Sequence, residues 1–269
     1  MQKNKTLMIY LLFVLSALVG CNQFQSVPEL PETSETDTLI DLSKFMPSSV
    51  LGDTILKHEY LIISYSIKYK NPEWTIYCLN KDKDNTRESV RRTNFHPDPS
   101  LPDGTAKTWD YGSSGYDRGH LVPAEDMNFN ESAMNQSFYM SNISPQLPDF
   151  NRGIWKKLEN SVRKLANENG QIIVITGPVF SSADSTIGDS IRVPNHFYKI
   201  IYKEAIKGKK PKALTFLIPN EKSDKPLKDY ISTIRIVETL TGLNFFPNMD
   251  TTFSEELENS KELSYWNFH

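Results

Sequence analysis

Residues 116–127 read Tyr-Asp-Arg-Gly-His-Leu-Val-Pro-Ala-Glu-Asp-Met, a stretch with an unusual density of reactive side chains. A carboxylate, a guanidinium, a glycine and an imidazole occupy four consecutive positions, from Asp117 to His120. A histidine can accept a proton near neutral pH, and an arginine can hold a phosphate or carboxylate through paired hydrogen bonds. These residue types together suit the hydrolysis of an anionic substrate.

A second polar cluster follows, with Ser-Asn-Ile-Ser-Pro-Gln over residues 141–146 and Asn-Arg-Gly-Ile-Trp-Lys-Lys-Leu-Glu over residues 151–159. Asp149 is placed to cap a helix that runs to Asn169 and stops at Gly170. Apolar side chains recur along this helix every three or four positions, which predicts one buried stripe. They are Trp155, Leu158, Val162, Leu165 and Ala166.

These two clusters resemble motifs of the DNA/RNA non-specific endonucleases, the family that contains a secreted bacterial nuclease and mitochondrial endonuclease G. The likeness covers roughly residues 58–245, and two motifs in the right order argue against chance agreement. The resemblance implies an α+β fold, with a mixed, mainly antiparallel central sheet flanked by helices. It also implies a ββα-metal core, in which the strands around His120 pack on the Asn151 helix. We therefore expect one endonuclease domain over residues 46–269.

The resemblance also implies roles for three residues. His120 would be the general base that takes a proton from the attacking water, and an unperturbed imidazole pKa of about 6.5 suits that role. Asn151 would offer its amide oxygen directly to Mg²⁺, which keeps several waters and takes few protein ligands; Mn²⁺ or another divalent cation could substitute. Glu159 lies eight residues further on, about two turns along the same helix side, where it would accept hydrogen bonds from metal-bound waters.

Three further residues are expected to support catalysis. Asn142 matches the asparagine of the family's second motif and would support the site, with an ordinary turn residue as the alternative. Arg118 would either bind phosphate or brace its loop. Arg92, or else Arg91, resembles the family's upstream arginine, which steadies the phosphate in the transition state; a solvated charge is the alternative.

Other chemistries find little support in the sequence. The five histidines include no pair at the spacing of helical zinc ligands, and the two cysteines form no cluster, so a zinc site is not expected. We find no phosphate-cradling glycine loop and no nucleophilic serine elbow. His196 lies in a segment that resembles a family strand, and we interpret it as structural.

Net charge alone would not indicate a nuclease. The formal charge is -3, and it becomes -5 once Lys3 and Lys5 leave with the N-terminal segment described below. Phosphate contacts normally need clustered Lys and Arg, and such clusters do occur locally. They are Arg91-Arg92, Arg152, Lys156-Lys157, Arg163-Lys164 and residues 207–212.

Residues 1–21 resemble a bacterial lipoprotein signal peptide. Lys3 and Lys5 precede an apolar run over residues 7–19, and Leu-Val-Gly-Cys at residues 18–21 resembles a lipobox. The run is short for a membrane span. We expect lipidation of Cys21 and a flexible acidic tether over residues 22–45. This implies a lipid anchor in the bacterial cell envelope, in the outer membrane on its periplasmic side or at the cell surface.

The remaining elements are predicted from periodicity and turn residues. Residues 60–69 and 74–79 should form a hairpin that is broken at Asn71-Pro72. Residues 81–115 are long for a passive connection and indicate a functional loop. The continuous Ile/Val run over residues 171–176 predicts a central buried strand. We also expect a short helix over 132–140, strands over 193–203 and 213–218, and a helix over 227–240.

The expected function is metal-dependent hydrolysis of DNA and RNA with little sequence preference. The resemblance implies fragments that carry 5′-phosphate and 3′-hydroxyl ends. A lipoprotein that binds nucleic acid or another envelope component without cleaving it is the alternative. The sequence leaves open the preference between DNA and RNA and the oligomeric state, including a homodimer.

Overall fold

One antiparallel sheet forms the centre of the part of the chain that the structure, a computed structural model, describes: residues 40–51, 54–80, 94–205 and 210–266. Its strands are ordered β1, β2, β3, β6, β9, β10, β11, and every neighbouring pair is antiparallel. Their respective bounds are Thr54–Lys57, Leu61–Ser66, Asn71–Leu79, Ile172–Val179, His196–Lys203, Lys212–Pro219 and Ile231–Ser232. The predicted α+β class with a mainly antiparallel sheet is confirmed.

Helices and two small ribbons complete the described chain. The α-helices are α2 (Glu131–Ser137), α3 (Lys156–Asn169), α4 (Ile234–Thr241) and α5 (Thr251–Glu258). Strand β4 (Asp117–His120) pairs with β5 (Ile143–Gln146), and β7 (Thr186–Ile187) pairs with β8 (Ile191–Arg192). Short 3-10 turns are η1 (Leu42–Phe45), η2 (Thr108–Tyr111), η3 (Ala124–Met127), η4 (Met140–Asn142), η6 (Leu227–Tyr230) and η7 (Ser264–Trp266). No helix within the described ranges is both long and apolar enough to cross a membrane.

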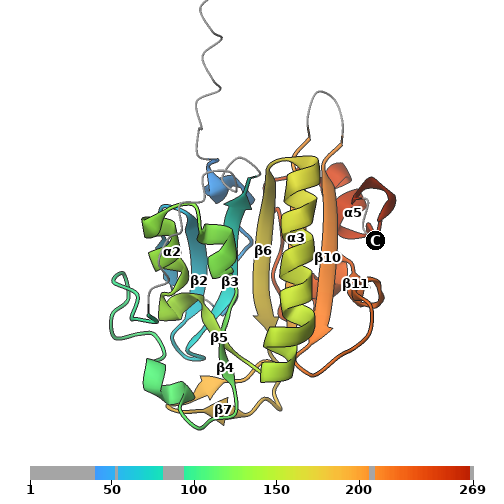
Figure 1. Ribbon diagram of the computed structural model, residues 1–269. Coiled ribbons are helices and arrows are strands. Elements are labelled where there is room, and N and C mark those ends of the chain that lie inside the picture. Colours follow the sequence, from blue (N-terminus) through green and yellow to red (C-terminus); the bar gives the residue numbers. More distant parts are fainter. Residues whose placement is uncertain (1–39, 52–53, 81–93, 206–209, 267–269) are drawn as a thin grey trace, which may run out of the picture. The chain divides into compact units, whose positions relative to one another are not determined.

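Both faces of the sheet are covered, so most residues of its central strands are buried. All eight residues of β6 are buried, which confirms the central strand predicted from the Ile/Val run. Alternation along a strand sends Phe197 and Ile201 of β9 to one face, and Tyr198 and Ile200 to the other. Helix α3 covers the first face and lies in front of β6 and β10 in Figure 1.

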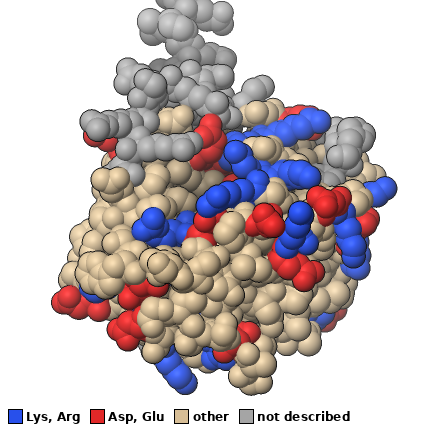
Figure 2. Space-filling view, turned by 60° about the horizontal axis from the view of Figure 1, so that its bottom comes forward, with Lys and Arg blue, Asp and Glu red and all other residues tan. Residues whose placement is uncertain are grey.

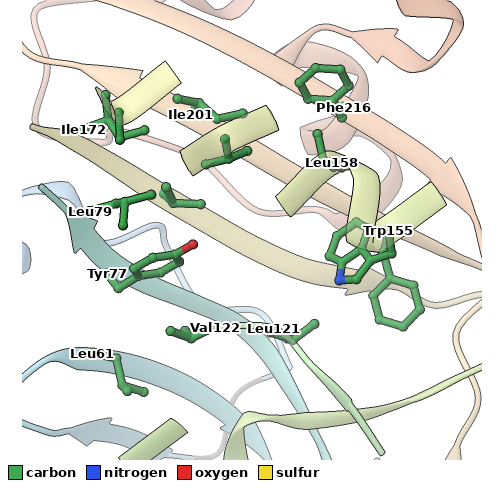
Figure 3. Packing of buried hydrophobic residues seen from close by; sticks show 14 of the residues in the cluster. Leu61, Tyr77, Leu79, Leu121, Val122, Trp155, Leu158, Ile172, Ile201 and Phe216 are labelled. Carbon is green, nitrogen blue, oxygen red and sulfur yellow. The ribbon is translucent and has the colours of Figure 1, made fainter. Parts of the chain in front are cut away.

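The face under α3 holds the residues that link the core to the site. Figure 3 shows Trp155, next to Leu158, above Leu121, and Val122 beside Tyr77 of β3. All five of these side chains have no exposed surface. Leu121 and Val122 directly follow His120, so the end of β4 is anchored in the main core.

Two predicted boundaries are wrong because tertiary pairing overrides local signals. Strand β3 begins at Asn71 and includes Pro72, and the chain reverses earlier, where Lys70 has φ +50°. Pro72 is tolerated because the ladder to β2 shifts register opposite it, between Ser64 and Tyr65.

The predicted helix over residues 227–240 is shorter in the structure, where α4 starts only at Ile234. Ile231 and Ser232 instead pair with β10 as strand β11. Thr233 then caps the helix, its hydroxyl oxygen accepting a hydrogen bond from the Ile236 amide at 3.2 Å. Gly242 ends α4 in the left-handed region at φ +75°, as predicted.

The folded unit also begins before the boundary that we predicted at residue 45. Leu42 and Phe45 are buried against the face of the sheet opposite α3, and Asp41 caps their 3-10 turn. The rest of the predicted tether, the signal segment and Cys21 lie outside the described residues.

Candidate active site

Strand β4 carries the Asp-Arg-Gly-His motif and presents its side chains to two sides. Arg118 and His120 share one side, and Asp117 and Gly119 share the other, because side chains alternate along a strand. Pairing with β5 places His120 opposite Ile143. A Cβ at Gly119 would lie 2.2 Å from the Gln146 carboxamide, so a larger residue there would force the Gln146 side chain to move.

The His120 imidazole is half-buried between two phenylalanine rings. Its ring centroid lies 5.2 Å from that of Phe95 and 4.9 Å from that of Phe138, which meets it edge-on. The Arg118 guanidinium stacks over the Phe95 ring, with its central carbon 4.9 Å from the ring centroid. The aromatic walls restrict the imidazole to a narrow range of orientations.

Arg118 also braces the neighbouring loop. Its Nη1 donates to the Thr108 carbonyl at 3.2 Å, and the side chain remains exposed. Of the two predicted roles, bracing is therefore observed, and the remaining guanidinium donors are open to solvent.

Phe95 itself belongs to a segment that is pinned to the core. The buried Asp98 carboxylate lies 2.9 Å from His58 Nε2 and accepts a hydrogen bond from the Ser141 hydroxyl. Burial would raise the pKa of Asp98, but these hydrogen bonds outweigh it and hold the pKa below its usual value. The described end of the predicted functional loop is thus fixed beside His120. Arg91 and Arg92, in the same predicted loop, lie outside the described residues.

Asn142 supports the site through the backbone. Its amide oxygen accepts from the Val122 amide at 2.9 Å, and its amide nitrogen donates to the carbonyls of Val122 and Ser137 at 2.9 and 2.8 Å. The side chain has no exposed surface, so it cannot touch a substrate in this conformation. The Asn142 backbone carbonyl also accepts from the Leu121 amide at 3.0 Å, so Asn142 fixes the two residues that follow His120, namely Leu121 and Val122.

On the other side of β4, Asp117 joins the strand to the segment that carries Asn151. Its Oδ2 accepts from Asn151 Nδ2 at 2.9 Å and from Arg152 Nε at 2.8 Å, while Oδ1 accepts from Arg152 Nη2 at 2.6 Å. Burial would raise the pKa of Asp117, but the hydrogen bonds from Arg152 and Asn151 outweigh it and lower the pKa. Asp117 therefore stays ionised and holds both side chains.

Asn151 does not begin a regular α-helix, which corrects our prediction of one continuous helix from Asp149. Residues Phe150–Trp155 form a wide π turn (η5), and Gly153 has non-helical angles, φ -101° and ψ -109°. Asp149 makes no capping bond with its side chain. The wide turn lets Phe150 and Trp155 stack in the core with ring centroids 5.3 Å apart. Asn151 and Glu159 therefore do not lie along one side of a single regular helix, as we had predicted.

Glu159 is a half-buried residue of α3 and borders a group of charges that lies between this helix and the sheet. The Asp126 carboxylate accepts from Arg163 and from the Tyr77 hydroxyl, and Lys199 lies on the same face of the sheet. Burial, reinforced by the charge of Asp126, raises the pKa of Glu159 to about 7 despite the opposing charge of Lys199. Burial also lowers the pKa of Lys199 to about 8.

Lys199 links this buried group to the end of β4. Its Nζ donates to the Thr176 hydroxyl at 2.7 Å and to the Leu121 carbonyl at 3.3 Å, and lies 4.9 Å from the centre of the Trp155 ring. We did not predict a role for Lys199, although a fully buried lysine within an apolar strand is a signal of such a link. The pairing of Asp126 with Arg163 was also missed, because 37 residues separate them.

The face of the molecule in Figure 2 carries mixed charges rather than a uniformly positive patch. Figure 2 shows Lys and Arg side chains across the upper part of the viewed face, with Asp and Glu between them. Such a surface can contact phosphates locally although the formal charge of the chain is -3. Within the described ranges, no three His, Cys, Asp or Glu side chains form a group that could enclose a metal ion.

Comparisons with known proteins find similar nucleases. The family model described as DNA/RNA non-specific endonuclease matches residues 41–252. The mitochondrial Nuclease 1 of Schizosaccharomyces pombe is 32% identical over 77% of this chain and 71% of its own length. Nuclease C1 of Cunninghamella echinulata is 34% identical over 73% of this chain and 84% of its own. A crystal structure of an EndoG/EndoGI complex superposes with a TM-score of 0.71, at 28% identity over 78% of this chain and 91% of the matched one.

Proposed function

This chain belongs to the DNA/RNA non-specific endonuclease family, and from that premise we propose that it hydrolyses phosphodiester bonds of DNA and RNA with little sequence preference. Membership makes the protein a nuclease, a hydrolase that acts on nucleic acids. The finer parts of the proposal are the roles of its residues: His120 is the general base, and Asn151 is the direct ligand of a divalent cation.

The hydrogen bond between Asp117 and Asn151 carries this proposal. Asp117 and His120 lie on the same four-residue strand, so the bond ties the metal-binding amide to the strand that bears the base. An ionised carboxylate accepts hydrogen bonds only, and it therefore fixes which end of the amide faces it. The Asn151 nitrogen points to Asp117, and the oxygen is turned away from it. Among the described residues, no donor bonds to that oxygen.

The donor set fits a hard cation that keeps most of its waters. The family depends on divalent metals, and the ion bound by this chain is proposed to be Mg²⁺, with Mn²⁺ as a substitute. Asn151 would hold it directly, and Glu159, which is only half-buried, would accept hydrogen bonds from its waters. The cation, when bound, supplies positive charge that neutralises the phosphoryl oxygens.

The protein's own residues then divide the remaining work. The neutral His120 imidazole takes the proton of the water that attacks phosphorus, and its aromatic walls keep it oriented for that transfer. The bond from phosphorus to the 3′ oxygen breaks, and the departing 3′ oxygen takes a proton from solvent water. The exposed Arg118 guanidinium binds a phosphoryl oxygen while one of its donors stays on the Thr108 carbonyl. Asn142 and Lys199 hold the backbone after His120, and Arg92 remains a proposed phosphate ligand.

A cleavage assay separates an enzyme from a binding protein. The purified protein is incubated with plasmid, single-stranded DNA and RNA, in Mg²⁺ or in chelator. Metal-dependent loss of all three substrates, with 5′-phosphate and 3′-hydroxyl ends, supports the proposal. Retention of intact nucleic acid in both conditions would support the alternative, an envelope lipoprotein that binds without cleaving.

We also propose that the protein is a lipoprotein of the bacterial envelope, anchored through Cys21. The support is the signal-like sequence that ends in Leu-Val-Gly-Cys. Intact mass spectrometry of membrane-extracted wild type should show a lipid on Cys21, and Cys21→Ser should lack it. A mature protein that begins elsewhere and carries no lipid would refute the anchor without affecting the nuclease assignment.

A further inference from the structure

Trp109 differs sharply from the other tryptophans of the chain. The sequence contains four, and Trp74, Trp155 and Trp266 have no exposed surface, whereas Trp109 is 74% exposed. It is the only large hydrophobic side chain that is exposed within residues 94–205 of the described chain. An exposed indole beside a proposed nuclease site is a candidate for contact with the substrate.

The turn that presents Trp109 is held on both sides. The Lys107 amide donates to the Asp110 carboxylate at 2.8 Å, and the Gly112 amide donates to the Trp109 carbonyl at 2.9 Å. The Tyr111 side chain is buried just after Trp109. The backbone under the indole is therefore already ordered, and binding a flat partner would lose little conformational entropy there.

Contacts place this turn at the rim of the proposed site. Arg118 donates to the carbonyl of Thr108, the residue before Trp109, and the same guanidinium lies over the Phe95 ring. Phe95 in turn contacts the His120 imidazole. A strand whose phosphate reached Arg118 and His120 would thus pass within a few nucleotides of the indole.

Nucleic-acid chemistry fits these features better than a protein partner does. Proteins that hold single strands combine cations along the phosphates with aromatic rings on which bases stack, and stacking tolerates any base. A protein interface normally needs a surface of about 800 Å² on each side, and Trp109 is a single exposed ring between polar neighbours.

We propose that Trp109 is a stacking subsite for an unpaired nucleobase of the substrate, and that it favours single-stranded DNA and RNA over duplex. This rests on the proposed function, because the neighbouring groups are assigned there to the scissile phosphate. In a duplex the bases are already stacked on each other, so no base offers a free face on which the indole could stack.

Fluorescence tests this subsite without catalysis. The difference between the tryptophan fluorescence of wild type and that of Trp109→Phe gives the emission of Trp109. In chelator, a short single-stranded DNA oligonucleotide should quench this emission. An abasic oligonucleotide of the same length should bind through its phosphates and leave this emission unchanged. Equal quenching by both oligonucleotides, or by neither, would overturn the proposal. So would loss of the exposed emission on raising the protein concentration alone, which would mean that a second copy covers Trp109.

Kinetic variants separate failure of this inference from failure of the nuclease assignment. Trp109→Leu should raise KM for single-stranded DNA about tenfold and leave plasmid cleavage within about twofold, whereas Trp109→Phe should retain most of the affinity. Phe253→Leu, on the exposed surface of α5, is the matched control and should change neither. If wild type cleaves but Trp109→Leu behaves as wild type on single strands, the subsite is refuted while the nuclease stands. If wild type cleaves nothing, the nuclease assignment fails first.

Discussion

Two aspartate–arginine pairs lie beside the proposed site and differ mainly in burial. Arg152 is 72% exposed and its partner Asp117 17%, whereas Arg163 is 13% exposed and Asp126 not at all. Burial acts on both carboxyl groups, but hydrogen bonds outweigh it for Asp117, whose pKa is lowered, and do not for Asp126, whose pKa is raised. The same pair of side chains therefore gives opposite shifts of the aspartate pKa, depending on how deeply the pair is buried.

This difference separates the work of the two regions. An exposed ion pair contributes little to stability, but the groups that it orients, such as Asn151, can be reached by water and substrate. A buried pair is strongly coupled to stability, because removal of one partner leaves a charge in the core. We infer that the exposed pair serves catalysis and the buried pair serves the fold.

The largest expected effect is on turnover in the exposed region. His120→Ala should lower kcat about 10²- to 10⁴-fold, the usual contribution of a positioned general base. Its free energy of unfolding should change by no more than about 2 kcal/mol, and binding of oligonucleotides should largely survive. Steady-state kinetics on plasmid and urea unfolding measure the two quantities. His196→Ala is the control: as a structural residue it should lower the free energy of unfolding and change the kcat of the folded protein little. A folded His120→Ala that cleaves within a few-fold of wild type would remove His120 from the mechanism.

The next effect is on stability in the buried region. Asp126→Asn should destabilise the protein by about 3–5 kcal/mol, because the largely buried Arg163 of α3 then loses its ion-pair partner. The double variant Asp126→Leu, Arg163→Met should recover most of that loss, since apolar groups of similar size leave neither charge of this pair without its partner. Urea unfolding of the variants decides this. A loss below about 1 kcal/mol for Asp126→Asn would erase the distinction between the two pairs.

The sequence predicted what is encoded locally. Both the motif at residues 117–120 and the Ile/Val run of β6 are short and contiguous. The run therefore predicted the buried strand β6, and Gly170 predicted the end of α3. The second motif located Asn142, but only the structure shows that its amide acts on the Val122 backbone.

The remaining features depend on contacts between distant residues. The burial of Lys199 and its bond to the Leu121 carbonyl join positions 78 residues apart. The kink at Gly153 arises because Phe150 and Trp155 must both reach the core, and helix propensity does not register that demand. Pro72 enters β3 for a similar reason, since its cost depends on the register of the partner strand.

Glu159, beside the buried pair, gives a pH-dependent effect of intermediate size. Its pKa is about 7 in the folded protein against 4.5 for the unperturbed group. Between those values the unfolded chain has released this proton and the folded chain has kept it. The contribution of Glu159 to the free energy of unfolding therefore falls as the pH rises from 4.5 to 7, by on the order of 1–3 kcal/mol.

Comparison with Glu159→Gln isolates this contribution. Urea unfolding in chelator at several pH values should show a wild-type stability that falls relative to the variant across that range. Parallel pH profiles for the two proteins would mean that Glu159 is solvated like a surface carboxylate, and that the buried group does not extend to it.

The most direct test is a Mg²⁺ titration of cleavage by Asp117→Asn, with Asn151→Ala and wild type beside it. Loss of the carboxylate that orients a metal ligand typically weakens metal binding or activity about 10- to 100-fold. We predict a half-saturating Mg²⁺ concentration raised by that factor in Asp117→Asn, with stability within about 1 kcal/mol of wild type, and loss of most Mg²⁺-dependent activity in Asn151→Ala. An Asp117→Asn protein with wild-type Mg²⁺ dependence, or one destabilised as much as Asp126→Asn, would contradict the assignment of the exposed pair to catalysis.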